Sequence, residues 1–465
     1  MGRMAMVWTG ALLGVLLVGC GTTPAAAQGG TRGQVRSGGG EGGDAWVGGS
    51  PMRTRVVVGD DGETYVGVWI DAPDDVPAVE ERASMALSLV VDTSGSMSGD
   101  KIAHARTAAA RVLENLEDGD VVSVYGFSDG VAEIAPPTVV SPSSRGELVA
   151  RVSDLRARGG TNLYGGLKAG ITRLGQASGS HPIRRVMLIS DGHANKGPSD
   201  PASLGDLAAR GTEHGTQVSA IGVGLGYDEH TLGALAVRSA GRLYHLSHSA
   251  GMASILEQEL ELLTHTVATD AHVEIAPAPG VRFLDCATPG ARMRGGKVRV
   301  KLGSVHAGQE REVLLRAELD TTRPGRHPVG TARLSFEPSR GGDAPVVQEK
   351  RLAYEVTRDR RAASKSEAPR VAAMVASHGA ARAQHRAAEL LSSGDGQSAA
   401  RELAGAEREL REAAADAPAP VRRKLRRQAQ GARGAANRAR KVRSADQGRG
   451  TSLEVHDMAM EAEGF

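Results

Sequence analysis

Aromatic side chains are scarce in this sequence. They make up 3% of the 465 residues, so the hydrophobic cores must come from Val, Leu, Ile and Ala, within the 40% of residues that are hydrophobic. A surplus of charge of one sign is also missing. The formal net charge is +2, which gives the chain as a whole no strong attraction to nucleic acid. The length predicts two or three domains.

Cysteine and long apolar runs are rare in the sequence, and two catalytic motifs are absent from it. The cysteines are Cys20 and Cys286, and after the N-terminal segment no run is long and apolar enough to span a bilayer. The sequence has no G-x-x-x-x-G-K-[ST] motif and no G-x-S-x-G motif. These two gaps exclude a P-loop ATPase and a hydrolase with a nucleophile elbow.

The N-terminal segment predicts export. Residues 1–20 hold one arginine and then a short apolar stretch that ends at Cys20, which is typical of a secretory signal peptide. Leu17–Cys20 resembles the lipobox of bacterial lipoproteins, which implies that Cys20 is acylated. Residues 21–50 are rich in Gly and Ser and predict a flexible linker. We therefore expect a lipid-anchored protein of the cell envelope, on the periplasmic side of a membrane or at the cell surface. The Gly21 that follows the cysteine permits sorting to an outer membrane.

An α/β pattern occupies residues 84–266. Apolar runs such as ALSLVV, RRVMLISDG and QVSAIGVG alternate with segments of helical periodicity. Buried parallel strands have this composition, and the alternation predicts a doubly wound, mostly parallel sheet. Ligands bind such sheets outside the carboxyl ends of the strands.

Acidic and hydroxyl residues follow these strands. They are Asp92, Ser94 and Ser96 in LSLVVDTSGSMSGDK, Thr161 in RGGTNLYGG and Asp191 in LISDG. Hard divalent cations prefer such a set of oxygen ligands, and two carboxylates balance the charge of one ion. The sequence therefore predicts a site for Mg²⁺, with Mn²⁺ and Ca²⁺ as alternatives. A Ser/Gly loop that only caps a helix is the competing interpretation.

The order DTSGS, GGTN and SDG on an α/β pattern resembles the von Willebrand factor A-type (VWA) domain and its metal-ion-dependent adhesion site. The resemblance implies that the five residues surround the ion, directly or through water, and that an acidic side chain of a protein partner completes its coordination. It implies neither a small-molecule substrate nor an enzyme. His193, Asn195 and Lys196 would lie on the partner-binding rim, unless they are simply solvated.

The flanking sequence is similar to inter-α-trypsin inhibitor heavy chains and secreted bacterial VWA proteins, in which β segments surround the VWA domain. Gly59–Gly62 predicts a hairpin turn. Residues 422–443 carry Arg and Lys but no acid, and they predict a solvated face rather than a lipid-binding surface. The expected division is a signal peptide 1–20, a linker 21–50, β segments 51–83, a VWA domain 84–266, a β-sandwich-like domain 267–358, a helical basic region 359–445 and a tail 446–465.

Two further interpretations have different consequences. The protein could be a structural or assembly scaffold of the envelope, in which the metal only stiffens the VWA domain. The DTSG sequence also resembles an aspartic protease signature, but those enzymes need two such acids close together, and SDGHAN lacks the motif. His245 and His248 lie too far along the chain from an acid pair to predict a zinc site.

Overall fold

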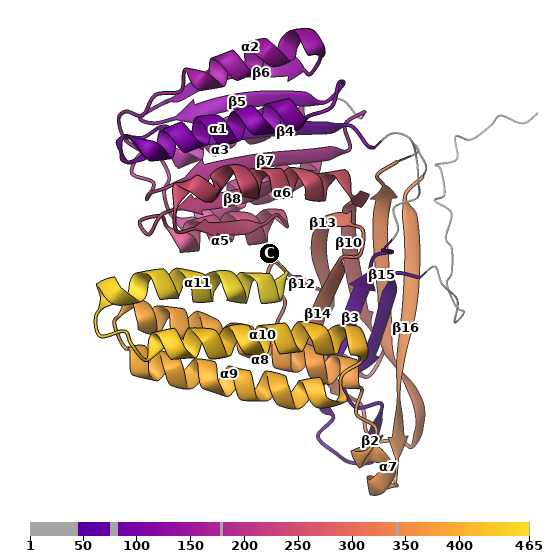
Figure 1. Ribbon diagram of the computed structural model, residues 1–465. Coiled ribbons are helices and arrows are strands. Elements are labelled where there is room, and N and C mark those ends of the chain that lie inside the picture. The colour runs from indigo at the N-terminus through magenta and orange to yellow at the C-terminus, as the bar shows by residue number, and fades with distance from the viewer. Residues whose placement is uncertain (1–44, 75–81, 177–179, 341–343, 465) are drawn as a thin grey trace, which may run out of the picture. The chain divides into compact units, whose positions relative to one another are not determined.

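The computed structural model describes residues 45–74, 82–176, 180–340 and 344–464 (Figure 1). The predicted signal peptide, with Cys20, and most of the predicted linker lie outside these residues. Within them, no helix combines the length and the apolar character that crossing a membrane requires.

The predicted doubly wound sheet is present. Its strand order is β6-β5-β4-β7-β8-β9, and every neighbouring pair is parallel except β5 and β6. The strands are β4 (Met85–Asp92), β5 (Val121–Phe127), β6 (Val131–Val139), β7 (Ile183–Ser190), β8 (Thr216–Val223) and β9 (Leu243–Leu246). Every residue of β4 and of β8 is buried, as expected for central strands that are covered on both faces.

Helices cover both faces of this sheet. One face packs against α1 (Asp100–Asn115), α2 (Pro142–Ser153) and α6 (Met252–Thr264). The other packs against α3 (Leu163–Gly175), α4 (Pro201–Gly211) and α5 (Glu229–Ser239). Strand β6 was not predicted from the sequence, because most of its residues are exposed and it contains Pro136 and Pro137. Proline is tolerated there because β6 is an edge strand.

A β-sandwich adjoins the α/β domain, with a hydrophobic core between its two sheets. The first sheet has the order β1-β3-β14-β11, with β1 (Val47–Pro51), β3 (Glu63–Asp71), β14 (Glu310–Leu319) and β11 (Val281–Cys286). The second has the order β12-β13-β10-β15-β16-β2, with β12 (Arg292–Arg294), β13 (Lys297–His306), β10 (Thr266–Pro277), β15 (Gly325–Pro338), β16 (Val346–Thr357) and β2 (Arg55–Val57). Segments from before and after the α/β domain therefore share both sheets.

Two details of the sandwich differ from the sequence analysis. The turn at Gly59–Gly62 does not close a hairpin, because β2 pairs in parallel with β16 while β3 pairs with β1 and β14 in the other sheet. Turn chemistry is local, whereas the pairing of strands depends on which sheet buries their side chains. The predicted linker is also shorter, because β1 begins at Val47 and pairs with β3.

The C-terminal part is helical to residue 463. It comprises α7 (Arg360–Ser364), α8 (Pro369–Ser392), α9 (Gly396–Asp416), α10 (Ala419–Ala439) and α11 (Ala445–Glu463). Figure 1 shows α8 to α11 side by side, and their buried faces are mostly Ala and Leu. The predicted tail is therefore the helix α11, and its N-cap Ser444 accepts a hydrogen bond from the Gln447 amide.

The basic segment has a buried side in addition to the expected solvated face. One side of α10 is buried, through Val421, Leu425 and alanines that include Ala429 and Ala436. The pattern was missed because alanine adds little hydropathy, although a helix lined with alanine can approach its neighbours closely. The arginines of α10 occupy the other side of the helix.

Candidate metal centre

The site lies where the direction of the sheet's winding reverses. Strand β4 pairs with β5 on one side and with β7 on the other, so connections from β4 lead to opposite halves of the sheet. Asp92 is the last residue of β4, and Asp191 directly follows β7. The two carboxylates therefore share one edge of the sheet, at the kind of position where open α/β sheets bind ligands.

Asp92 is fully buried at this edge. Its Oδ1 accepts a hydrogen bond of 2.8 Å from the Ser94 amide, and its Oδ2 accepts one of 2.7 Å from Ser190 Oγ. Burial raises the pKa of this carboxyl and the nearby Asp191 charge adds to the effect, while the bonds from Ser94 and Ser190 oppose it. A bound cation would supply the counter-charge that these two serines only partly replace.

Hydroxyl groups connect the two loops that carry the carboxylates. Ser94 Oγ lies 3.0 Å from Ser96 Oγ, and Ser96 Oγ donates a hydrogen bond of 2.7 Å to Asp191 Oδ1. The other oxygen of Asp191 forms an ion pair with the Lys101 ammonium. The structure thus brings Ser94, Ser96 and Asp191 into one chain of contacts, next to Asp92.

The loop that carries Thr161 joins the same cluster through its backbone. The Gly95 amide donates to the Gly159 carbonyl at 3.0 Å, which ties this loop to the one that follows β4. The Thr161 amide donates to Asn195 Oδ1 at 2.8 Å. Thr161 is only 4% exposed, and its side-chain hydroxyl makes no hydrogen bond to another residue in the described ranges. A hydroxyl at this edge that bonds no other described residue is a candidate ligand.

The donor set suits a hard divalent cation. Asp92, Asp191, Ser94, Ser96 and Thr161 offer only oxygen atoms, and the two carboxylates can balance a double charge. Across the part of the chain that the structure describes, no group of three or more His, Cys, Asp or Glu side chains could hold a metal ion. A site here must therefore combine its two acids with neutral hydroxyls, and Mg²⁺ and Mn²⁺ accept such ligands more readily than Zn²⁺ does.

The three predicted rim residues have different surroundings. His193 is exposed, with Nδ1 3.8 Å from Asp228 Oδ2, and Lys196 Nζ lies 3.7 Å from Asp129 Oδ1. Asn195 instead positions the site, because its side chain accepts from the Thr161 amide and its own amide donates to the Thr161 carbonyl at 3.1 Å.

Sequence reasoning missed Ser190, Lys101 and Asp129. Asp129 accepts a hydrogen bond of 3.2 Å from the Gly160 amide, and its carboxylate lies so close to Gly159, where φ is +72°, that a Cβ would be 2.3 Å from its oxygen. Asp129 and Ser190 could have been found from a triplet that occurs twice in the sequence. The triplet Ser-Asp-Gly occurs directly after β5, at residues 128–130, and again at the end of β7, at residues 190–192.

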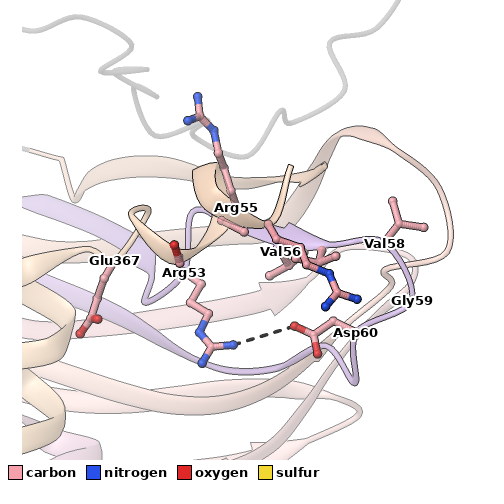
Figure 2. A pocket seen from close by; sticks show the side chains of 11 residues that line it. Arg53, Arg55, Val56, Val58, Gly59, Asp60 and Glu367 are labelled. Atoms are coloured by element: carbon pink, nitrogen blue, oxygen red, sulfur yellow. Dashed lines mark ion pairs between the residues drawn. The ribbon is translucent and has the colours of Figure 1, made fainter. Parts of the chain in front are cut away.

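A hollow elsewhere in the protein lacks comparable chemistry. It has a volume of about 540 Å³ and is lined by β2, α7 and the segments next to them, including Arg53, Asp60 and Glu367 (Figure 2). Its one drawn ion pair joins Arg53 to Asp60 at 3.9 Å, and these side chains are 58% and 40% exposed. An ion pair that is this exposed to solvent contributes little energy. The edge of the α/β sheet is therefore the better candidate for the functional site.

Comparisons with known proteins find relatives that match part of the chain. An uncharacterized protein of Synechocystis sp. is 25% identical over 58% of this chain and 66% of its own length. Inter-alpha-trypsin inhibitor heavy chain H3 of Rattus norvegicus is 26% identical over 44% of this chain and 23% of its own length. The chain thus spans less than two thirds of either relative.

A solved structure reproduces the fold over most of the chain. The protein described as von Willebrand factor type A from Catenulispora acidiphila superposes with a TM-score of 0.72, covering 90% of this chain and 96% of that one at 16% identity. Residues 87–258 also match the family model of the von Willebrand factor type A domain, a domain that commonly mediates protein–protein interaction. The α/β sheet that carries Asp92 and Asp191 is therefore a von Willebrand factor type A domain.

Proposed function

We propose that this protein is a cell-envelope lipoprotein that binds a protein partner through a divalent cation held at the carboxyl edge of its VWA sheet. The observation that supports the proposal most directly is the all-oxygen cluster of Asp92, Asp191 and neighbouring hydroxyls at the point where the winding reverses. The proposed role is binding and not catalysis.

Each residue of the cluster has a distinct task in this proposal. Asp92 and Asp191 carry the negative charge, and Ser94, Ser96 and Thr161 contribute neutral oxygens. Ser190 fixes the orientation of the Asp92 carboxylate through the 2.7 Å hydrogen bond to Oδ2. When bound, Mg²⁺ supplies an electrophilic position that a carboxylate of the partner can complete.

The substitution Asp92→Asn tests the metal site. The amide keeps the shape of the carboxylate and an acceptor for the Ser94 amide, and the Ser190 hydroxyl can rotate to accept instead of donate. Calorimetry on the full-length protein should show Mg²⁺ binding by the wild type and a loss of about a hundredfold or more in the variant, because one ligand charge is gone.

Thermal melting supplies the control for folding. Burial disfavours the charged form of Asp92, so in chelator the Asp92→Asn protein should melt at the same temperature as the wild type or higher. Pull-downs from envelope extracts, with and without chelator, should then recover a partner only with the cation and only with the wild type. Equal Mg²⁺ affinity in the two proteins would reject the metal site.

A further inference from the structure

Lys101 is an unexpected residue at the proposed site. It is the second residue of α1, and the N-terminus of a helix disfavours positive charge because of the helix dipole. The residue is instead compensated by Asp191, whose side chain is fully buried and whose Oδ2 contacts the ammonium. The Lys101 side chain is 35% exposed, so its stem reaches inward from the surface.

Lys101 sets the net charge of the cluster together with Asp92 and Asp191. On the rim, the Lys196 ammonium lies by Asp129, and the His193 ring, which is charged only when protonated, lies by Asp228. Lys101 forms its ion pair with Asp191, and the Asp191 charge in turn acts on Asp92. The cluster therefore carries one net negative charge without a metal and one net positive charge with a divalent ion bound.

We propose that Lys101 is a built-in counter-cation of this site: it occupies Asp191 Oδ2 when no metal is bound and competes with the divalent ion for that carboxylate. This inference rests on the proposed function. Lys101 lowers the affinity for the cation, but it stabilises the metal-free protein by pairing with a buried charge. It also leaves the loaded site positive, which favours an acidic group on the partner.

The test is Mg²⁺ binding by Lys101→Met, measured by calorimetry on the full-length protein. Removing a positive charge that shares a carboxylate with the ion should tighten Mg²⁺ binding by about tenfold or more. Lys101→Arg keeps the charge and should bind Mg²⁺ close to the wild-type value. Lys168→Met is the matched control, because it removes one positive charge from an exposed position on α3 of the same domain.

A second measurement follows the metal-free state. In chelator, Lys101→Met should melt at a lower temperature than Lys168→Met, because Asp191 loses its partner, and added Mg²⁺ should raise its melting temperature more than that of the wild type. If Lys101→Met does not fold without metal, Lys101→Gln, which keeps a donor without charge, takes its place in both measurements.

The outcomes separate this inference from the proposed function. A folded variant that binds Mg²⁺ no more tightly than the wild type overturns the role of Lys101 and leaves the metal site standing. A wild-type protein that binds neither Mg²⁺ nor Mn²⁺ overturns both. Tighter binding in Lys101→Met alone, with Lys101→Arg and Lys168→Met near the wild type, supports the counter-cation.

Discussion

At the scale of single residues, the site contains an acidic side chain, Asp92, at a position where burial disfavours its charged form. Asp92 is fully buried, and burial raises the pKa of its carboxyl, so the acid costs the protein stability when no cation is present. A core position with only a structural role could hold Asn or Ser there with less penalty. The cost of burying this carboxylate supports the proposal that a cation binds at Asp92.

Thr161 tests whether the ion recruits a partner or only stiffens the domain. Its hydroxyl has no hydrogen-bond partner among the described residues, so Thr161→Val should keep the metal-free melting temperature nearly unchanged while preserving the side chain's volume. Loss of a ligand oxygen should weaken Mg²⁺ binding by about tenfold or more, as seen for changes around metal sites. Thr161→Ser restores the oxygen and should bind like the wild type.

The scaffold interpretation predicts a different result for Thr161→Val. If the ion only stiffens the domain, partner recovery from envelope extracts should persist at temperatures where the variant remains folded. If the ion recruits the partner, recovery should fall together with Mg²⁺ affinity while the protein is still folded. Wild-type Mg²⁺ affinity in the valine variant would show that the hydroxyl is not a ligand.

At the scale of secondary-structure elements, helix α11 reaches the loop beside the site. The Arg449 guanidinium donates to both carboxylate oxygens of Glu229, at 2.6 and 2.7 Å, and to the carbonyls of Leu225 and Tyr227 at 3.0 and 2.8 Å. Burial would raise the pKa of Glu229, but the hydrogen bonds and charge of Arg449 outweigh it, so this pKa lies below its ordinary value. The β8–α5 loop is thus fixed by a helix from the C-terminal part.

Replacing Arg449 should loosen this loop. Arg449→Met leaves the largely buried Glu229 carboxylate without its bidentate partner, and we expect a loss of about 2–3 kcal/mol in the free energy of unfolding, at the lower end for buried pairs because Arg449 is partly exposed. Hydrogen exchange of the amides at residues 224–228 should accelerate. Arg433→Met, at an exposed position of α10, is the matched control. Unchanged exchange in the loop would show that α11 does not hold it.

Sequence patterns predicted the elements that depend on local periodicity and missed those that depend on partners. Strand β4 was visible as a continuous apolar run, and helix α1 was visible because its apolar residues repeat with the helical period. Helix α11 was read as a tail because its buried face is short and mixed, with Leu453, His456 and Met460 covered only after it packs. Lys101 and Asp129 were missed because their roles depend on contacts with distant loops.

At the scale of the whole molecule, polar contacts connect cores that have few aromatic side chains. Lys424 of α10 pairs with Glu312 of the sandwich at 3.1 Å, and the Arg370 guanidinium of α8 lies 4.5 Å from the centre of the Trp69 ring while it also bonds Asp71 of β3. Arg449 makes the corresponding link to the VWA domain. Each pair is partly shielded from solvent and therefore constrains how the elements dock as well as stabilising them.

The place of the protein in the cell decides which partners the site can meet, and Cys20 is the residue that tests it. The lipobox-like Leu17–Cys20 predicts acylation of Cys20. Cys20→Ser removes the thiol that carries the lipid, so the protein should appear in the soluble fraction or accumulate as an unprocessed precursor. A single acyl chain binds membranes only marginally, so stable anchoring needs the additional chains of a mature lipoprotein.

Membrane fractionation with immunoblotting measures the distribution, and Cys286→Ser, which removes the thiol in the sandwich, should fractionate like the wild type. A processed Cys20→Ser protein that stays as membrane-bound as the wild type would refute the lipid anchor.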